Sequence, residues 1–156
     1  RMIYNHKPSA YFHKYADESK TPLYPFGFGL SYTNYTYGKP TLSNGSLSGN
    51  EKITVSVEVS NTGEFDGEEI AQLYIRDNVS SATRPVKELK EYQRVVLNTG
   101  ETKTVEFTLD AGSLAFYDIN MEYCVEPGEF TIMTGSSSAR KDLKTTTLTV
   151  NDKIEL

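Results

Sequence analysis

The stretch from residue 53 to residue 77 constrains the fold of this chain more than any other part of its sequence. It begins with four aliphatic residues that alternate with polar ones, a period of two that predicts a strand with one buried and one solvated face. The four are Ile53, Val55, Val57 and Val59. The next residues, 61–67, are rich in Asn, Asp and Gly. They predict a turn, because these residues accept positive φ angles at low cost.

The second strand of this pair, Ile70 to Ile75, is apolar on both faces. Ile70 and Tyr74 share one face of the predicted strand. Ala71, Leu73 and Ile75 share the other face. A short strand that is apolar on both sides is typical of the middle of a packed sheet. The pair therefore predicts the centre of an all-β sandwich.

The rest of the chain repeats this rhythm of short strands and turns. Asp110 can cap a single helical turn at 110–114, and Pro127-Gly128 predicts a tight turn between two strands. Seven or eight short strands at this spacing predict an antiparallel β-sandwich of the immunoglobulin or fibronectin type III kind. The predicted core consists of Val55, Val57, Val59, Leu73, Ile75, Val105, Phe107, Leu109, Phe130 and Ile132.

Composition narrows the function classes. The 156 residues are enough for one ordinary core, and the net charge of −5 provides no basic footprint for nucleic acid. Cys124 is the only cysteine, so no internal disulfide is possible. No apolar run approaches the roughly 20 residues that cross a bilayer, so we expect no membrane partner. The chain opens without an apolar signal segment, and we expect it to be a piece of a longer protein.

Motifs for catalysis or cofactor binding are weak. Four acidic residues crowd the turn after the first strand, and paired carboxylates are what a glycosidase requires. They are Glu64, Asp66, Glu68 and Glu69, and a solvated acidic turn is the simpler interpretation. His6 and His13 lack a third ligand at a suitable spacing, so we expect no metal. Gly27-Phe28-Gly29 lacks the third glycine of a dinucleotide loop, and we expect no cofactor and no catalytic residue in this chain.

The N-terminal 31 residues form a separate region in this interpretation. Residues 1–22 hold both histidines and aromatic residues at no regular period, which predicts an irregular arm. Residues 23–32 interleave large apolar groups with Pro25 and two glycines, so this segment is too apolar to remain in water and too broken for a regular strand. We expect it to lie against this domain or a neighbouring one, and the arm could also mediate self-association.

Several blocks of sequence resemble one family. They are PLYPFGFGLSYT at 22–33, VSNTG at 59–63, QLYIRD at 72–77, RPVKELK at 84–90, LAFYD at 114–118 and EPGEF at 126–130. Together they are similar to the C-terminal domain of glycoside hydrolase family 3 enzymes, the β-glucosidases, β-xylosidases and their relatives. The resemblance spans nearly the whole chain. Residues 4–9, YNHKPS, resemble the tail of the α/β-sandwich domain that precedes it in these enzymes.

The resemblance implies a parent enzyme that hydrolyses terminal β-glycosidic bonds and is periplasmic or secreted. Its nucleophile and acid/base lie in domains that precede this one, so no catalytic residue can be carried over. Residues 1–31 would then be the tail of the preceding domain with a linker, and residues 32–156 a fibronectin type III-like domain. The expected partners are the catalytic domains of the same chain; a site for an oligosaccharide or cell-wall component is the alternative.

An interdomain docking surface is the functional site that this resemblance predicts. The junction segment and the mixed-charge run that begins at residue 84 combine apolar and polar groups as interfaces do. The predicted docking residues are Tyr24, Pro25, Phe26, Phe28, Leu30, Tyr32, Arg84 and Lys87. Tyr92 and Tyr123 have no assigned role and remain candidates for a weak sugar site.

Overall fold

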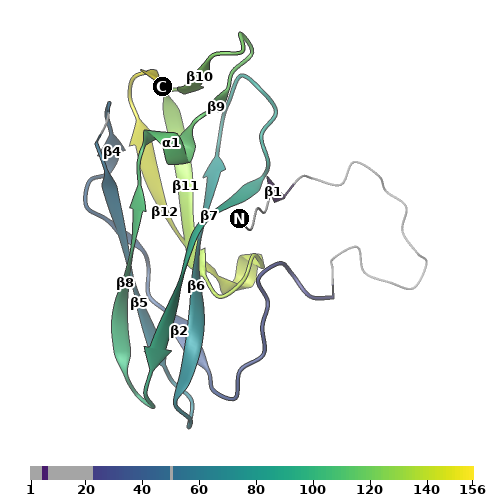
Figure 1. Ribbon diagram of the computed structural model, residues 1–156, viewed down its shortest axis with the longest axis vertical. Helices are drawn as coiled ribbons and strands as arrows, with labels where there is room; N and C mark the ends of the chain where they lie inside the picture. Colours follow the sequence, from purple (N-terminus) through teal and green to yellow (C-terminus); the bar gives the residue numbers. More distant parts are fainter. Residues whose placement is uncertain (1–4, 7–22, 50) are drawn as a thin grey trace, which may run out of the picture.

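The computed structural model describes residues 5–6, 23–49 and 51–156. Predictions about the rest of the arm, including His13 and self-association through residues 1–22, therefore lie outside the described residues. Within these ranges the chain forms two facing β-sheets, a small third sheet at one end and one short α-helix (Figure 1). The predicted all-β sandwich is confirmed.

The larger sheet contains the predicted central strand. Its order is β1 (Asn5–His6), β7 (Lys87–Leu97), β6 (Gly67–Asp77), β11 (Gly128–Gly135), β12 (Leu143–Val150) and β4 (Ser46–Leu47). β6 lies between β7 and β11, as its apolar residues on both faces predicted. These pairs are antiparallel, whereas β4 runs parallel to β12, a departure from the purely antiparallel sandwich that the sequence predicted.

The second sheet is built around β5 (Ile53–Asn61). β8 (Thr102–Leu109) pairs with one edge of β5, while β2 (Tyr35–Tyr37) and β3 (Thr41–Leu42) pair with the other. β2 and β3 are separated by a segment that contains Pro40, which cannot donate to the ladder. The third sheet consists of β9 (Phe116–Tyr117), β10 (Tyr123–Val125) and β13 (Ile154–Glu155).

The core lies between the two larger sheets. All ten predicted core residues are buried, and none exposes more than 4% of its surface. Leu47, Leu97, Leu148 and Val150 extend this core from β4, β7 and β12. The period of two in β5 and β8 correctly predicted one buried face on each strand, because alternate side chains of both strands face the opposite sheet.

Two short elements complete the fold. α1 (Ala111–Leu114) begins at Asp110, whose carboxylate accepts from the Ser113 backbone N–H at 2.9 Å, while the Asp110 N–H donates to the Ser113 hydroxyl. This capping box confirms the predicted helical turn. The hydrogen bonds from Ser113 lower the pKa of Asp110. A 3₁₀ helix, η1 (Arg140–Asp142), connects β11 to β12.

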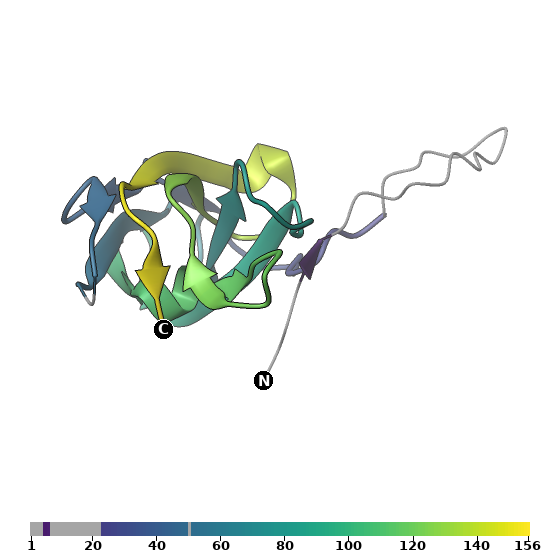
Figure 2. The ribbon, with the colours of Figure 1, turned by 90° about the horizontal axis from the view of Figure 1, so that it is seen from above.

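The prediction of an irregular N-terminal arm is corrected at its two described residues. Residues 1–22 were predicted to be irregular, yet Asn5 and His6 pair antiparallel with Glu88 and Lys87 at the edge of β7. A two-residue strand is too short to show a periodicity in the sequence. β1 forms because the edge of β7 offers unpaired backbone groups to it. Figure 2 shows β1 and residues 23–32 on the same side of the sandwich.

Candidate functional site

The junction segment, residues 23–32, runs along the outer face of the larger sheet. It begins with a turn in which the Phe28 N–H donates to the Pro25 carbonyl at 3.1 Å. Gly27, the third residue of this turn, has a φ of 78°. A type II turn requires a positive φ at that position, which explains a glycine there. The turn directs the apolar residues on either side of it to the surface of the domain.

A buried polar cluster fastens this turn to the sandwich. The Gln72 side-chain amide on β6 donates to the Gly27 carbonyl at 3.1 Å and to the Ser136 carbonyl at 2.6 Å. The Tyr74 hydroxyl donates to the Gln72 side-chain oxygen, and the Ser138 N–H donates to the Phe26 carbonyl at 2.8 Å. Gln72 is 4% exposed and Tyr74 is fully buried. These contacts explain why Gln72 and Tyr74 are buried on the outer face of β6: the junction segment and the loop after β11 cover them.

Gly27 is also required by a close approach. A Cβ atom at this residue would lie 2.1 Å from the Gln72 side-chain oxygen. Replacing Gly27 with Ala should therefore lower the free energy of unfolding by about 1–2 kcal/mol from the positive φ alone, with a further loss if Gln72 is displaced from its carbonyl partners. Gly29→Ala is the matched control, since no atom lies within 4 Å of a Cβ there. Equal unfolding midpoints of the two variants in urea would contradict this role of the turn.

Two hollows flank the junction turn. One, of about 320 Å³, is bordered by polar groups that include Glu68, Ser137 and Lys141. The other, of about 390 Å³, is mainly apolar and is lined by Phe26, Phe28, Ile70, Leu89 and Tyr92, together with Gly27, Gly29 and Gln72. The apolar hollow lies between the junction segment and the outer faces of β6 and β7, and it remains open to solvent.

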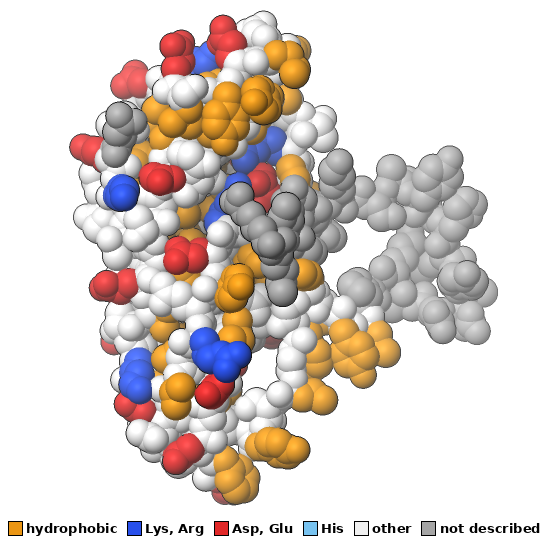
Figure 3. Space-filling model, viewed as in Figure 1, with side chains coloured by type: hydrophobic (Ala, Val, Ile, Leu, Met, Phe, Trp, Pro, Cys, Tyr) orange, Lys and Arg blue, Asp and Glu red, His pale blue; other side chains and the backbone are white. Residues whose placement is uncertain are grey.

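The predicted docking residues of the junction segment are exposed to different degrees. Pro25 and Phe26 are half-buried against the sheet, and Phe28 is 44% exposed. Tyr24, Leu30 and Tyr32 are 66%, 91% and 97% exposed. Figure 3 shows apolar side chains around this segment on one face of the molecule. The segment therefore contacts its own domain through a few groups and presents the others outward.

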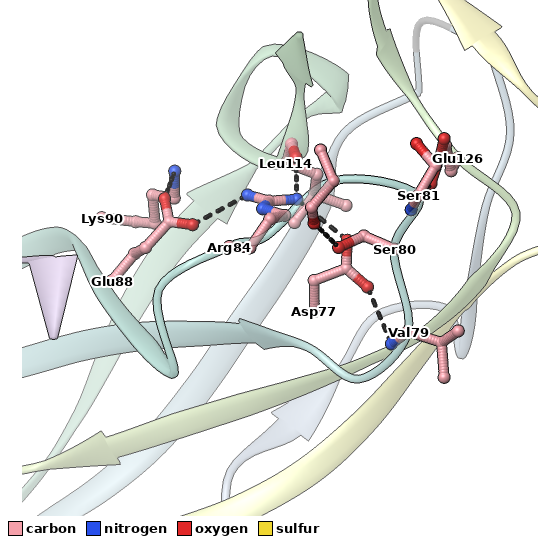
Figure 4. A network of polar contacts seen from close by, with 10 residues as sticks. Asp77, Val79, Ser80, Ser81, Arg84, Glu88, Lys90, Leu114 and Glu126 are labelled. Atoms are coloured by element: carbon pink, nitrogen blue, oxygen red, sulfur yellow. Dashed lines mark hydrogen bonds and ion pairs between the residues drawn. The ribbon is translucent and has the colours of Figure 1, made fainter. Parts of the chain in front are cut away.

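Arg84, which was predicted to dock on a neighbour, instead points into its own domain. Its guanidinium donates to Asp77 at 3.0 Å, to Glu88 at 2.9 Å and to the Leu114 carbonyl at 3.0 Å (Figure 4). It also lies 4.6 Å from the centre of the Phe116 ring. The Arg84 side chain is 6% exposed and that of Asp77 is 1% exposed. Arg84 thus connects the loop after β6 to the end of α1 and to β9.

The two carboxylates of this network respond differently to their surroundings. Burial raises the pKa of Asp77, although the Arg84 guanidinium acts in the opposite direction. Burial would also raise the pKa of Glu88, but its contacts with Lys90 and Arg84 outweigh that effect and lower it. Lys90 lies 2.8 Å from Glu88 on the side away from Arg84. The network is therefore a charged cluster whose members neutralise one another inside the domain.

Lys87 also makes its contacts within the domain. Its ammonium group donates to the Ser138 carbonyl and lies 6.0 Å from the centre of the Tyr74 ring. Burial lowers the pKa of Lys87. Because Ser138 also donates to Phe26, Lys87 supports the loop that holds the junction turn. Lys87 therefore supports the junction segment from within the domain.

A second exposed apolar group lies at the end of the domain formed by β9 and β10. We call it the end cluster: Tyr117, Ile119, Met121 and Tyr123. Their exposed fractions are 59%, 75%, 75% and 40%. The Tyr117 and Tyr123 rings are 5.0 Å apart and inclined by 47°. The sequence pattern did not predict this cluster, because its members belong to two short strands and the turn between them; only Tyr123 had been noted, without a role.

Three carboxylates of the acidic turn contact different parts of the domain. Asp66 accepts from the Thr99 N–H at 2.7 Å, and Glu68 forms an exposed ion pair with Arg94. Glu69 accepts from the Tyr37 hydroxyl at 2.8 Å, and burial raises the pKa of Glu69. In the described ranges no three His, Cys, Asp or Glu side chains are placed to hold a metal ion. None of the described helices is long and apolar enough to cross a bilayer.

Comparison with known proteins identifies the fold and its relatives. A family model described as a fibronectin type III-like domain matches residues 69–138. The chain is 50% identical to a β-xylosidase of Formosa agariphila over 137 residues, which is 88% of this chain and 19% of that protein. It is 46% identical over 134 residues to a periplasmic β-glucosidase of Salmonella typhimurium, covering 86% of this chain and 18% of that protein.

Solved structures agree with these sequence matches. A β-glucosidase from Erythrobacter marinus superposes with a TM-score of 0.84 at 41% identity, over 94% of this chain and 19% of that one. A β-glucosidase from Listeria innocua superposes with a TM-score of 0.79 at 34% identity, over 92% of this chain and 19% of that one. The chain thus spans about a fifth of the length of these relatives. It belongs to the fibronectin type III-like domains of glycoside hydrolase family 3.

Proposed function

We propose that this domain is a non-catalytic accessory part of a β-glucosidase- or β-xylosidase-type enzyme, and that it stabilises the catalytic domains by packing on them. The observation that carries this proposal is the junction segment, which is fastened to the sandwich by its backbone while Leu30 and Tyr32 expose 91% and 97% of their surface. A segment held in place while its apolar side chains face outward is suited to contact with a neighbouring domain.

The size of the relatives supports the same function. They are about five times as long as the part that this chain matches, so most of such an enzyme lies outside this domain. In this proposal residues 1–31 contain the end of the preceding domain and the junction, and residues 32–156 form the sandwich. The docking residues are Tyr24, Pro25, Phe26, Phe28, Leu30 and Tyr32, while Arg84 and Lys87 hold the surface in shape from within. The periplasmic β-glucosidase among the relatives supports a periplasmic or secreted parent.

The test compares the full-length enzyme with two surface variants. Leu30→Ser should lower the melting temperature of the full-length enzyme while leaving that of the isolated 156-residue chain unchanged, because Leu30 is 91% exposed in this domain. Val96→Ser is the matched control, since Val96 is an exposed aliphatic residue on β7. Its melting temperature should change little in either protein.

A second arm of the test addresses the alternative function. The isolated chain is titrated with cello-, xylo- and laminari-oligosaccharides by calorimetry, and no saturable heat is expected. Saturable binding of a sugar, together with a Leu30→Ser enzyme that melts like the wild type, would reverse the assignment in favour of a carbohydrate-binding module.

A further inference from the structure

The end cluster is presented by a turn that several hydrogen bonds hold. Asp118 shapes this turn: its carboxylate accepts from the backbone N–H groups of Asn120 at 2.9 Å and Glu122 at 3.0 Å. Its own N–H donates to the Glu122 carbonyl, and the Met121 N–H donates to the Asp118 carbonyl, both at 3.0 Å. Met121 has a φ of 64°, a conformation that side-chain-bearing residues rarely adopt without support. The turn therefore projects Ile119 and Met121 into solvent in one defined arrangement.

The end cluster lies near the place where the N-terminal part of the chain reaches the domain. Asn5 pairs with Glu88, and Glu88 accepts from Arg84 at 2.9 Å. Arg84 stacks on Phe116, the neighbour of Tyr117 in β9. Figure 3 shows apolar side chains at the β9–β10 end and around the junction segment on the same face of the molecule. Two apolar surfaces thus lie on either side of β1.

From this arrangement we infer that the end cluster is a second docking surface, and that it contacts the domain which precedes β1 in the same parent chain. The inference rests on the proposed accessory function and extends it from one contact to two. A domain joined to β1 is tethered next to the end cluster, so contact with it requires no second molecule and is favoured by a high effective concentration. Two separated contacts would also fix the orientation of the sandwich, which a single small contact cannot do.

The chemistry of the end cluster favours an apolar protein surface. Its two tyrosine rings are inclined by 47°, so they form no flat platform for a sugar ring. The nearby charges are paired, since Lys153 forms ion pairs with both Asp118 and Glu122. An apolar centre with a paired, polar rim is the common composition of a protein interface.

Cysteine labelling tests the inference directly. Ile119→Cys and the control Val96→Cys are each made in the 156-residue chain and in the full-length enzyme, and the rate of maleimide modification at each site is measured by peptide mass spectrometry. The native Cys124 is fully buried and burial raises the pKa of its thiol, so its background reaction is slow. We expect the Ile119→Cys site to react at least about tenfold more slowly in the enzyme than in the isolated chain, and the Val96→Cys site to react equally in both.

Three outcomes would overturn the inference. Equal labelling of the Ile119→Cys site in the two proteins would show that nothing covers the end cluster. Protection that disappears on dilution would indicate a second copy of the enzyme, and protection that appears only with added oligosaccharide would indicate a sugar. A third site, Leu30→Cys, separates this result from the proposed function: if Leu30→Cys is protected in the enzyme while Ile119→Cys is not, the junction contact stands and the second surface is rejected.

Discussion

Replacing Arg84 with Met should lower the free energy of unfolding by about 3 kcal/mol at neutral pH, because it leaves the buried Asp77 carboxylate without its counter-ion and removes one of the two cations bonded to Glu88. Asp77 would suffer most, since its side chain is only 1% exposed and Arg84 is the cation bonded to it. Arg94→Met is the matched control: Arg94 also forms a 2.9 Å ion pair, with Glu68, but those side chains are 67% and 54% exposed. The control should cost less than about 1 kcal/mol, since exposed pairs contribute little.

The loss caused by Arg84→Met should also depend on pH. In the wild type, burial already raises the pKa of Asp77 and Arg84 opposes that effect. Without Arg84 the pKa of Asp77 in the folded state should rise further above its value in the unfolded chain. A group with a raised pKa binds protons more tightly when folded, so acidification should stabilise the variant relative to the wild type and the difference should shrink. Urea unfolding at neutral and mildly acidic pH measures it; a loss below about 1 kcal/mol, or one that grows on acidification, would contradict the network's role.

The second large effect is expected in the core. Phe107 on β8 is fully buried between the two sheets, next to other large apolar groups. Phe107→Ala should lower the free energy of unfolding by about 3–5 kcal/mol, because it removes buried apolar surface and leaves a cavity that the sheets cannot close. Phe65→Ala is the control, since Phe65 lies in the turn after β5 and is 59% exposed. Denaturant unfolding measures both; equal losses would mean that the core is not organised around β5 and β8.

The predictions that depended on periodicity were the most successful. Alternation in β5 and β8 identified buried faces correctly, and the two apolar faces of β6 identified it as a central strand. These features are local consequences of the pleat, which turns successive side chains to opposite faces. The helix cap at Asp110 could also be predicted from the sequence, because its partner Ser113 is only three residues away. The family resemblance could be recognised from the sequence as well, since it depends on blocks of contiguous residues.

The candidate site was only partly predictable. The apolar junction segment was found because its composition is unusual for an irregular region. The inward direction of Arg84 was missed, since a mixed-charge run resembles a solvated surface until Asp77 and the Leu114 carbonyl are brought beside it. The strand at Asn5–His6 was missed for a similar reason, because it depends on the edge of β7 some 80 residues later in the chain.

The sequence by itself determined the sandwich, its central strand, its core and the family, because each depends on residues that are neighbours along the chain or on a repeated period. Only the tertiary structure decided what covers the outer face of β6, where Gln72 contacts a turn 45 residues earlier and a loop 64 residues later. It also decided that Tyr117 and Tyr123 form one exposed cluster. Such contacts depend on how whole sheets pack together. A sequence pattern cannot predict them, because hydrogen bonding and burial depend on distance in space and not on separation along the chain.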